Sequence, residues 1–419
     1  MTNPHTPRVF RAGLRLGLAL ILSGQAASTV WAQVPTFPGS TPIEPIGSIN
    51  VPGLPQNAAD YSVVSEVHFK YATQIPAAGD RSLALSRLAG TATFSNQLDM
   101  AEKSVIAAAN AALLIPQGLV RDQRLISTVS ALLDLAEVRI RDGVDNSSTT
   151  EVAARGGKKI DRFDLIRKGQ VDWKLAGDLA LKIQNPTYRN ELMFKVADGM
   201  AAGSQAIVND FPKAEGGGGQ KSARGFDLSY SGLPDQILQH AAAYATLIDR
   251  HVWHDRAMVS VATAASESRQ FDRAIAIARM IPQPEVRTDA LLKIAESQAR
   301  KNDAAGATAT YREAALSVAS IPLADPRAVL AGVLIDNLLS VGRFDDARAS
   351  VVLYPDDARR MVALGAIAES MGKRGSAQAA LAWINKEIPE EKRSPLYRRV
   401  SNGVVAAIVN NRTNRELDK

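Results

Sequence analysis

Residues 287–314 read RTDALLKIAESQARKNDAAGATATYREA, and this stretch decides the fold class. Apolar or small residues recur in it at intervals of three and four positions, as they do along one face of an α-helix. We interpret it as a first helix, a short turn and a second helix, with Ala295 on the first helix and Ala307 on the second. Small side chains at these positions allow the two backbones of an antiparallel helix pair to approach closely.

The same pattern recurs along the chain. An Arg opens the first helix of these units. The residue eight positions after this Arg is small or apolar, and we call it the first anchor. These Arg–anchor pairs are Arg81 and Ala89, Arg189 and Ala197, Arg287 and Ala295, Arg327 and Ile335, and Arg360 and Ala368. A second anchor follows twelve residues later; the second anchors are Ala101, Ala274 (counted from Ala262), Ala307, Ala347 and Ala380. The last four are separated by 33, 40 and 33 residues, a period that indicates an array of helical hairpins.

These residues resemble the tetratricopeptide repeat. Its consensus has an apolar–small pair on the first helix, then Gly-x-[Tyr/Phe]-x-x-Ala, then an aromatic residue and a further Ala on the second helix. Leu291, Ile294, Ala295, Ala307, Tyr311 and Ala314 match those steps in the clearest unit. The resemblance covers residues 256–385 and is partial at 81–101 and 189–197. It does not assign repeat positions to residues 105–185. It implies an all-α, right-handed solenoid of stacked antiparallel helix pairs. The alternative is an all-α bundle without repeats.

The composition agrees with helices and excludes several classes of protein. Of 419 residues, 46% are hydrophobic and only 5% aromatic, which favours close helix packing over a β-sandwich. The chain has no Cys, which excludes a disulfide scaffold, a Cys-ligated zinc site and a Cys nucleophile.

Residues 1–32 have the pattern of a secretory signal peptide. Three Arg precede an apolar run at 16–22, and Val30-Trp31-Ala32 ends in small or tolerated residues before Gln33. We therefore predict export to the periplasm or cell envelope of a bacterium. An uncleaved membrane anchor is the alternative. Without these three Arg the remaining chain carries +3 of the total charge of +6, which argues against a nucleic-acid partner. No later stretch is apolar enough to predict a transmembrane segment in the mature chain.

Proline and glycine mark the expected domain boundaries. A Pro-rich linker is expected at 33–58, because its six Pro exclude helix and central strand. Next come an N-terminal helical region with degenerate repeats at 59–210 and a Gly-rich flexible loop at 211–227, which contains four consecutive Gly. A C-terminal helical repeat region is expected at 228–410 and a polar tail at 411–419.

The recurring Arg invites two interpretations. It lies at the start of a helix, where the helix dipole disfavours a cation, and an acidic residue often precedes it. In the first interpretation Arg pairs with this acid and donates to the carbonyl groups that end the preceding helix, so that it joins successive repeats. In the second it forms a row of ligand-facing cations.

The sequence contains few candidates for chemistry. His251 and His254 are spaced to share a helix face and could ligate a metal, but the Glu and third His of the zincin pattern are missing. No Gly-x-Ser-x-Gly nucleophile elbow is present. We therefore predict no catalytic, cofactor-binding or metal-binding residue and no cofactor. The expected function is a non-catalytic scaffold that binds a protein or peptide segment in a groove of the repeats. The alternatives are a metal- or small-ligand-binding protein that uses His251 and His254, or an enzyme without a recognisable motif.

Overall fold

The computed structural model describes residues 58–145, 162–210, 232–249 and 252–417. Within these ranges the secondary structure is helical and no strand is present. The α-helices are α3 (Ala58–Thr73), α4 (Ala78–Phe94), α5 (Leu98–Leu113), α6 (Leu119–Asp145), α7 (Arg162–Ala180), α8 (Pro186–Asp210), α9 (Leu233–Thr246), α10 (Val252–Glu267), α11 (Phe271–Arg279), α12 (Pro284–Arg300), α13 (Ala304–Ala319), α14 (Ala324–Ser340), α15 (Phe344–Ser350), α16 (Asp357–Lys373), α17 (Ala377–Glu387) and α18 (Arg393–Leu417). Two short 3₁₀ helices, η4 (Val351–Leu353) and η5 (Glu390–Lys392), precede α16 and α18.

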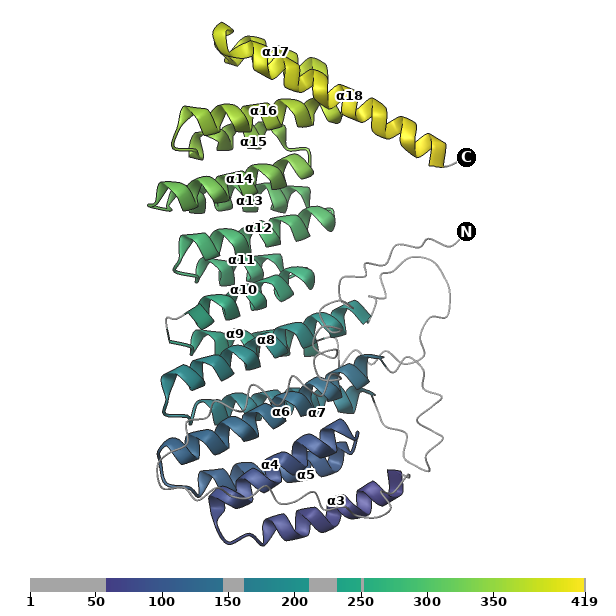
Figure 1. The fold of residues 1–419 in the computed structure, drawn as a ribbon, viewed down its shortest axis with the longest axis vertical. Helices are drawn as coiled ribbons and strands as arrows, with labels where there is room; N and C mark the ends of the chain where they lie inside the picture. The colour runs from purple at the N-terminus through teal and green to yellow at the C-terminus, as the bar shows by residue number, and fades with distance from the viewer. Residues whose placement is uncertain (1–57, 146–161, 211–231, 250–251, 418–419) are drawn as a thin grey trace, which may run out of the picture. The chain divides into compact units, whose positions relative to one another are not determined.

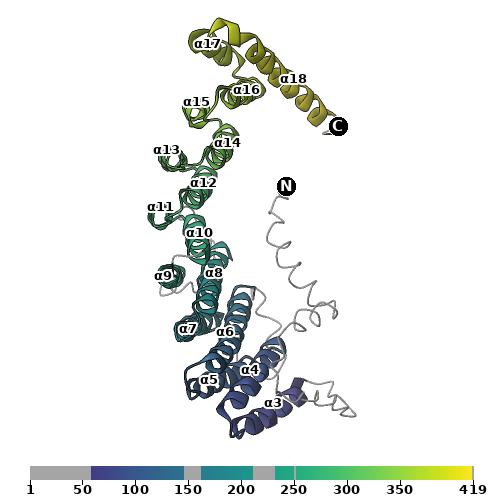
Figure 2. The ribbon, with the colours of Figure 1, turned by 60° about the vertical axis from the view of Figure 1, so that its left-hand side comes forward.

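The helices form an all-α solenoid of stacked pairs, as the sequence predicts. From α4 onward the even-numbered helices, which we call helices A, each pack against the next helix A along the chain. The odd-numbered helices, called helices B, pack against helix A of their own pair and against the following helix A. Figure 1 shows the order of the pairs, and Figure 2 shows helices A and helices B as two neighbouring rows.

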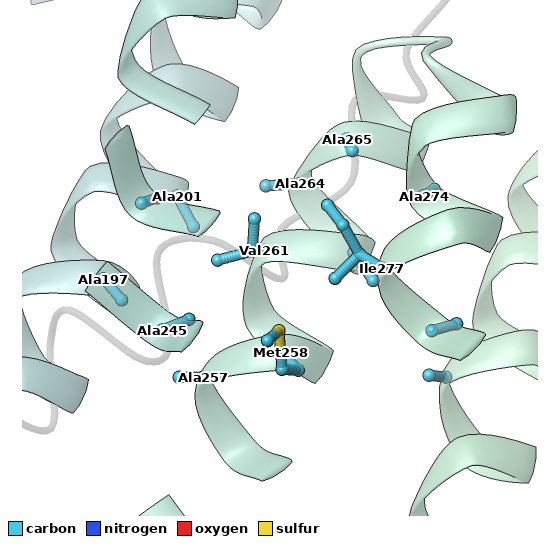
Figure 3. Close-up of a cluster of buried hydrophobic side chains, with 14 of the residues drawn as sticks. Ala197, Ala201, Ala245, Ala257, Met258, Val261, Ala264, Ala265, Ala274 and Ile277 are labelled. Atoms are coloured by element: carbon cyan, nitrogen blue, oxygen red, sulfur yellow. The ribbon is translucent and has the colours of Figure 1, made fainter. Parts of the chain in front are cut away.

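The predicted anchors lie in the hydrophobic core. Every first anchor from Ala89 to Ala368 and every second anchor from Ala101 to Ala380 is at most 2% exposed. Figure 3 shows the packing around α10: Met258 and Val261 lie between Ala197 and Ala201 of α8 and Ile277 of α11. Because each helix pair shares this core with its neighbours, no pair needs to bury its apolar face alone.

The five described turns from helix A to helix B share one backbone geometry. One residue in each of these turns has a left-handed conformation; these residues are Asn96, Arg269, Asn302, Gly342 and Gly375, with φ between 57° and 79°. The amide of the next residue donates to the carbonyl five positions back, as in Gln97 to Ala92 and Ser376 to Met371. This is the Schellman motif, which satisfies the last carbonyls of a helix. In the turn at 268–274, which lacks Gly, Arg269 adopts the left-handed conformation that Gly342 adopts in the turn after α14.

Three of the five recurring Arg join helix B to the next helix A. The guanidinium groups of Arg81, Arg287 and Arg360 donate to the carbonyls of Ile75, Ile281 and Tyr354, six residues earlier, at 2.9–3.0 Å. This part of the first interpretation is confirmed for these three. The acid contact is formed by Arg360, whose Nη1 lies 3.3 Å from Asp357, whereas no ion pair joins Arg287 to Glu285 within the described residues.

An Ile at the end of helix B defines the repeat register of residues 105–185, which the anchor pattern does not assign. The amides of Ile115, Ile183 and Ile281 each donate to the carbonyl three residues back. Arg121 and Arg189 follow the first two by six residues, as Arg287 follows Ile281. The described residues within 105–185 therefore belong to the same array, with α6 and α7 as one pair.

The described residues do not include the predicted signal peptide at 1–32, nearly all of the predicted linker at 33–58 or the predicted loop at 211–227. The separation of 40 residues between Ala307 and Ala347 reflects a longer helix B, since α13 has 16 residues and α11 has 9. Helix α18 continues through the expected polar tail as far as Leu417. In the described part of the chain, no helix combines the length and apolar character needed to cross a bilayer.

Candidate functional site

A groove crosses three consecutive helices A on the side that helices B leave uncovered. It lies over α8, α10 and α12 and has a volume of about 620 Å³. The side chains that give it its chemical character are Asp198, Gln205, Arg256, Thr263, Asp289 and Lys293. We call it the helix-A groove.

Helical spacing places these side chains on one face. Arg256, Ser260 and Thr263 are separated by four and three residues on α10, and Asp289 and Lys293 by four on α12. Residues at such intervals lie above one another on a helix surface. The anchors bury the opposite face, so the intervening positions point outward. The repeat pattern thus builds a row of outward positions on each helix A.

Contacts between helices hold the groove in shape. The hydroxyl of Ser260 on α10 donates to a carboxylate oxygen of Asp198 on α8 at 2.5 Å. The rings of Phe194 and Trp253 lie 5.2 Å apart and pack α8 against α10. Lys293 and Asp289 form an ion pair of 2.8 Å along α12. Charges of both signs, two hydroxyl groups and the amide of Gln205 therefore line the groove among apolar side chains, which suits hydrogen bonding to the main chain of an extended segment.

None of the described groups with a clearly displaced pKa lines this groove. Asp172 on α7 is buried, and burial raises its pKa to about 6 although Arg139 opposes the shift. Arg139, on α6, is 1% exposed; its Nη1 lies 2.7 Å from Asp172, and its Nη2 contacts Glu102 of α5. Burial also lowers the pKa of Lys301, which lies at the end of α12 and contacts Glu267. These are links between helices rather than parts of a reaction site.

The structure describes only one of the two histidines of the predicted alternative. His254 lies in α10 and is 8% exposed, and its Nδ1 is 2.9 Å from Asp255. His251 lies outside the described residues. His240 of α9 has a buried Nδ1 without a hydrogen-bond partner. Within the described residues no group of three or more His, Asp or Glu is arranged to hold a metal ion.

Sequence reasoning selected none of the groove residues. The sequence alone does not distinguish Arg256, Asp289 and Lys293 from other charged residues on helix surfaces. The signal that could have found them is the anchor pattern itself, because the outward positions of adjacent helices A follow from it.

Comparisons with known proteins add little to this description. No protein-family model and no curated protein matches the chain. Among solved structures, the chain is similar to a circular tandem repeat protein described as having a novel repeat topology and enhanced subunit contact surfaces. The identity is 13%, the TM-score is 0.26, and the match covers 85% of this chain and 75% of that one. A score this low defines no shared topology, so the assignment rests on the described helices: the chain is a helical-repeat protein.

Proposed function

We propose that this protein is an exported, tetratricopeptide-like scaffold that binds an extended segment of a partner protein in the helix-A groove. The observation that carries the proposal is the groove itself, which spans α8, α10 and α12 and presents hydrogen-bonding side chains from all three.

The chemistry of the groove supports an extended peptide as the ligand. Arg256 and Lys293 supply donors, and Asp198 and Asp289 supply acceptors. An extended chain exposes its amides and carbonyls on both sides and can use both kinds of group. The pattern of residues 1–32 supports a partner in the bacterial envelope. Fold alone is weak support for a function, so the experiment must locate the binding surface.

Site-specific photo-crosslinking in the native cell tests the proposal. A photoreactive amino acid replaces Thr263 in the groove or, as the control, exposed Ala276 on helix B α11. We expect a discrete crosslinked protein in the envelope fraction from position 263 and none from position 276. Equal crosslinking from both positions, or none from position 263, would contradict the proposal.

Charge reversal then tests the chemistry of the groove. The double substitution Arg256→Glu and Lys293→Glu should weaken binding of the captured partner by about tenfold or more, which corresponds to about 1.4 kcal/mol. The matched control Arg273→Glu changes an exposed Arg of α11 and should leave binding unchanged.

A further inference from the structure

Helix α3 is a helix B that has no helix A beside it among the described residues. Its end is that of the other helices B: the amide of Ile75 donates to the carbonyl of Ala72, as Ile281 donates to Ala278. Four residues before this Ile, the equivalent side chains of α5, α7, α9, α11 and α13 are between 2% and 7% exposed. Tyr71 holds that position in α3 and is 67% exposed. Helices of the same pair or of the preceding pair cover this position elsewhere. Ser317 of α13 donates to the carbonyl of Pro284 in helix A α12, and the ring of Tyr244 in α9 lies against Gly177 of the preceding helix B, α7.

The uncovered face of α3 continues onto α4 as a groove of about 770 Å³, which we call the α3–α4 groove. Its lining is mostly apolar and includes Val64, Tyr71, Leu88 and Phe94. Thr91 and Ser95 of α4 also line it. Their equivalents in α12, Ser297 and Lys301, donate to the carbonyl of Ser266 in the preceding helix A. The α3–α4 groove is therefore the position of a helix A that the described residues do not supply.

At the other end of the array, α18 is a helix A that no helix B follows among the described residues. Helix α18 packs against helix A α16 as a following helix A does, and Arg393 at its start donates to the carbonyl of Ile388, five residues earlier, at 2.7 Å. Eight residues later Ser401 is exposed, although the first anchors at this position in other helices A are buried. The apolar side chains of Val405, Ile408 and Val409 are 49–58% exposed. No helix B follows α18 to cover them within the described residues.

We propose that the protein associates head to tail, with α18 of one copy occupying the α3–α4 groove of a second copy. The two unpaired helices then complete one A–B pair and bury both apolar faces through the interface that every internal pair uses. The charges permit this contact. Residues 400–410 include no charged side chain, and the charged or titratable groups of the α3–α4 groove are Arg87, His68 and Tyr71. Such a heterologous contact generates a ring if the rotation closes and a chain if it does not.

Two substitutions place a charge on either side of the proposed contact. Tyr71→Glu alters the groove, and Val405→Glu alters α18; both side chains are exposed, so the single chains should fold with unchanged circular dichroism. The control Leu316→Glu changes an apolar residue of α13 that is 72% exposed and lies away from both ends. Light scattering after size exclusion gives the mass of the full exported chain over about a hundredfold range of concentration.

We expect the wild type and Leu316→Glu to be larger than a monomer, with a mass that rises with concentration or reaches a fixed ring. Each end variant alone should be monomeric. An equimolar mixture of the two end variants retains one intact groove and one intact α18, so it should give a 1:1 dimer and nothing larger.

Several results would overturn the proposal. A monomeric wild type at every concentration would show that the ends do not meet; residues 1–57 of the same chain or another protein would then have to cover the groove. Loss of association in Tyr71→Glu but not in Val405→Glu would indicate a symmetric contact between two α3–α4 grooves. A mixture that stays monomeric would exclude head-to-tail pairing. None of these results depends on the helix-A groove.

Discussion

At the scale of single residues, the most informative group is Arg139. Its guanidinium is buried between α5, α6 and α7 and contacts two carboxylates, Asp172 and Glu102. Burying such a group is costly unless its partners remain, and a buried charge left without its partner destabilises a protein by several kcal/mol. The contact fixes how three helices meet in a part of the array where the tetratricopeptide pattern is weak.

Arg139→Met should lower the free energy of unfolding by about 3–5 kcal/mol at neutral pH, because it leaves Asp172 buried without its cation. The loss should shrink as the pH falls from neutral towards the usual range of an Asp. Asp172 already has a pKa raised by burial, and without Arg139 it takes up a proton more readily, which removes the unpaired charge. Urea unfolding at several pH values measures both effects.

The double variant Arg139→Met with Asp172→Leu serves as the control. It removes both members of the buried pair and should recover at least half of the lost stability. A loss below about 1 kcal/mol in the single variant would show that the pair is not desolvated as described.

At the scale of elements, glycine sets the closest helix approaches. Trp173 of α7 packs against α8 over Gly203: a Cβ at Gly203 would lie 2.1 Å from a ring carbon of Trp173. Real side chains do not tolerate such a distance, so α7 and α8 can approach this closely only because residue 203 has no side chain. Gly90 of α4 differs, since a Cβ there meets no atom within 4 Å.

Gly203→Ala and Gly90→Ala should therefore have opposite effects. The first should destabilise the protein by about 1–3 kcal/mol, because the indole must move within a packed core. The second should stabilise it by about 0.5–1 kcal/mol, because Ala loses less backbone entropy than Gly in a helix. Urea unfolding of both variants gives the comparison, and equal changes would contradict the packing of Trp173.

At the scale of the whole array, the stability of each helix pair depends on its contacts with the neighbouring pairs. A helix pair that contacts only its neighbours can open without unfolding distant pairs. The last contact, between α16 and α18, depends on Gly403, where a Cβ would lie 2.0 Å from the carbonyl oxygen of Glu369.

Gly403→Ala should separate α18 from α16 while leaving the far end of the array folded. We expect faster amide hydrogen exchange in α16, α17 and α18 and unchanged exchange in α4 and α5, measured by mass spectrometry. Gly365→Ala is the matched control, because its Cβ would meet only the flexible side chain of Arg399 at 3.6 Å. Uniformly faster exchange along the chain would show that the array unfolds as one unit.

The sequence by itself determined the all-α repeat architecture, because an anchor alanine needs only local helical periodicity and a fixed spacing to be recognised. It also predicted the Arg contact with the preceding helix, since both groups lie within six residues. It missed the register of residues 105–185, where Ile115 and Arg121 carried the signal but the anchor pattern did not include them. Only the tertiary structure decided which outward residues form a groove, because Asp198, Arg256 and Lys293 belong to three helices whose lateral alignment no local pattern specifies. The exposure of Tyr71 and Val405 likewise depends on which helices are absent beside them, and that is a property of packing between helices rather than of either helix alone.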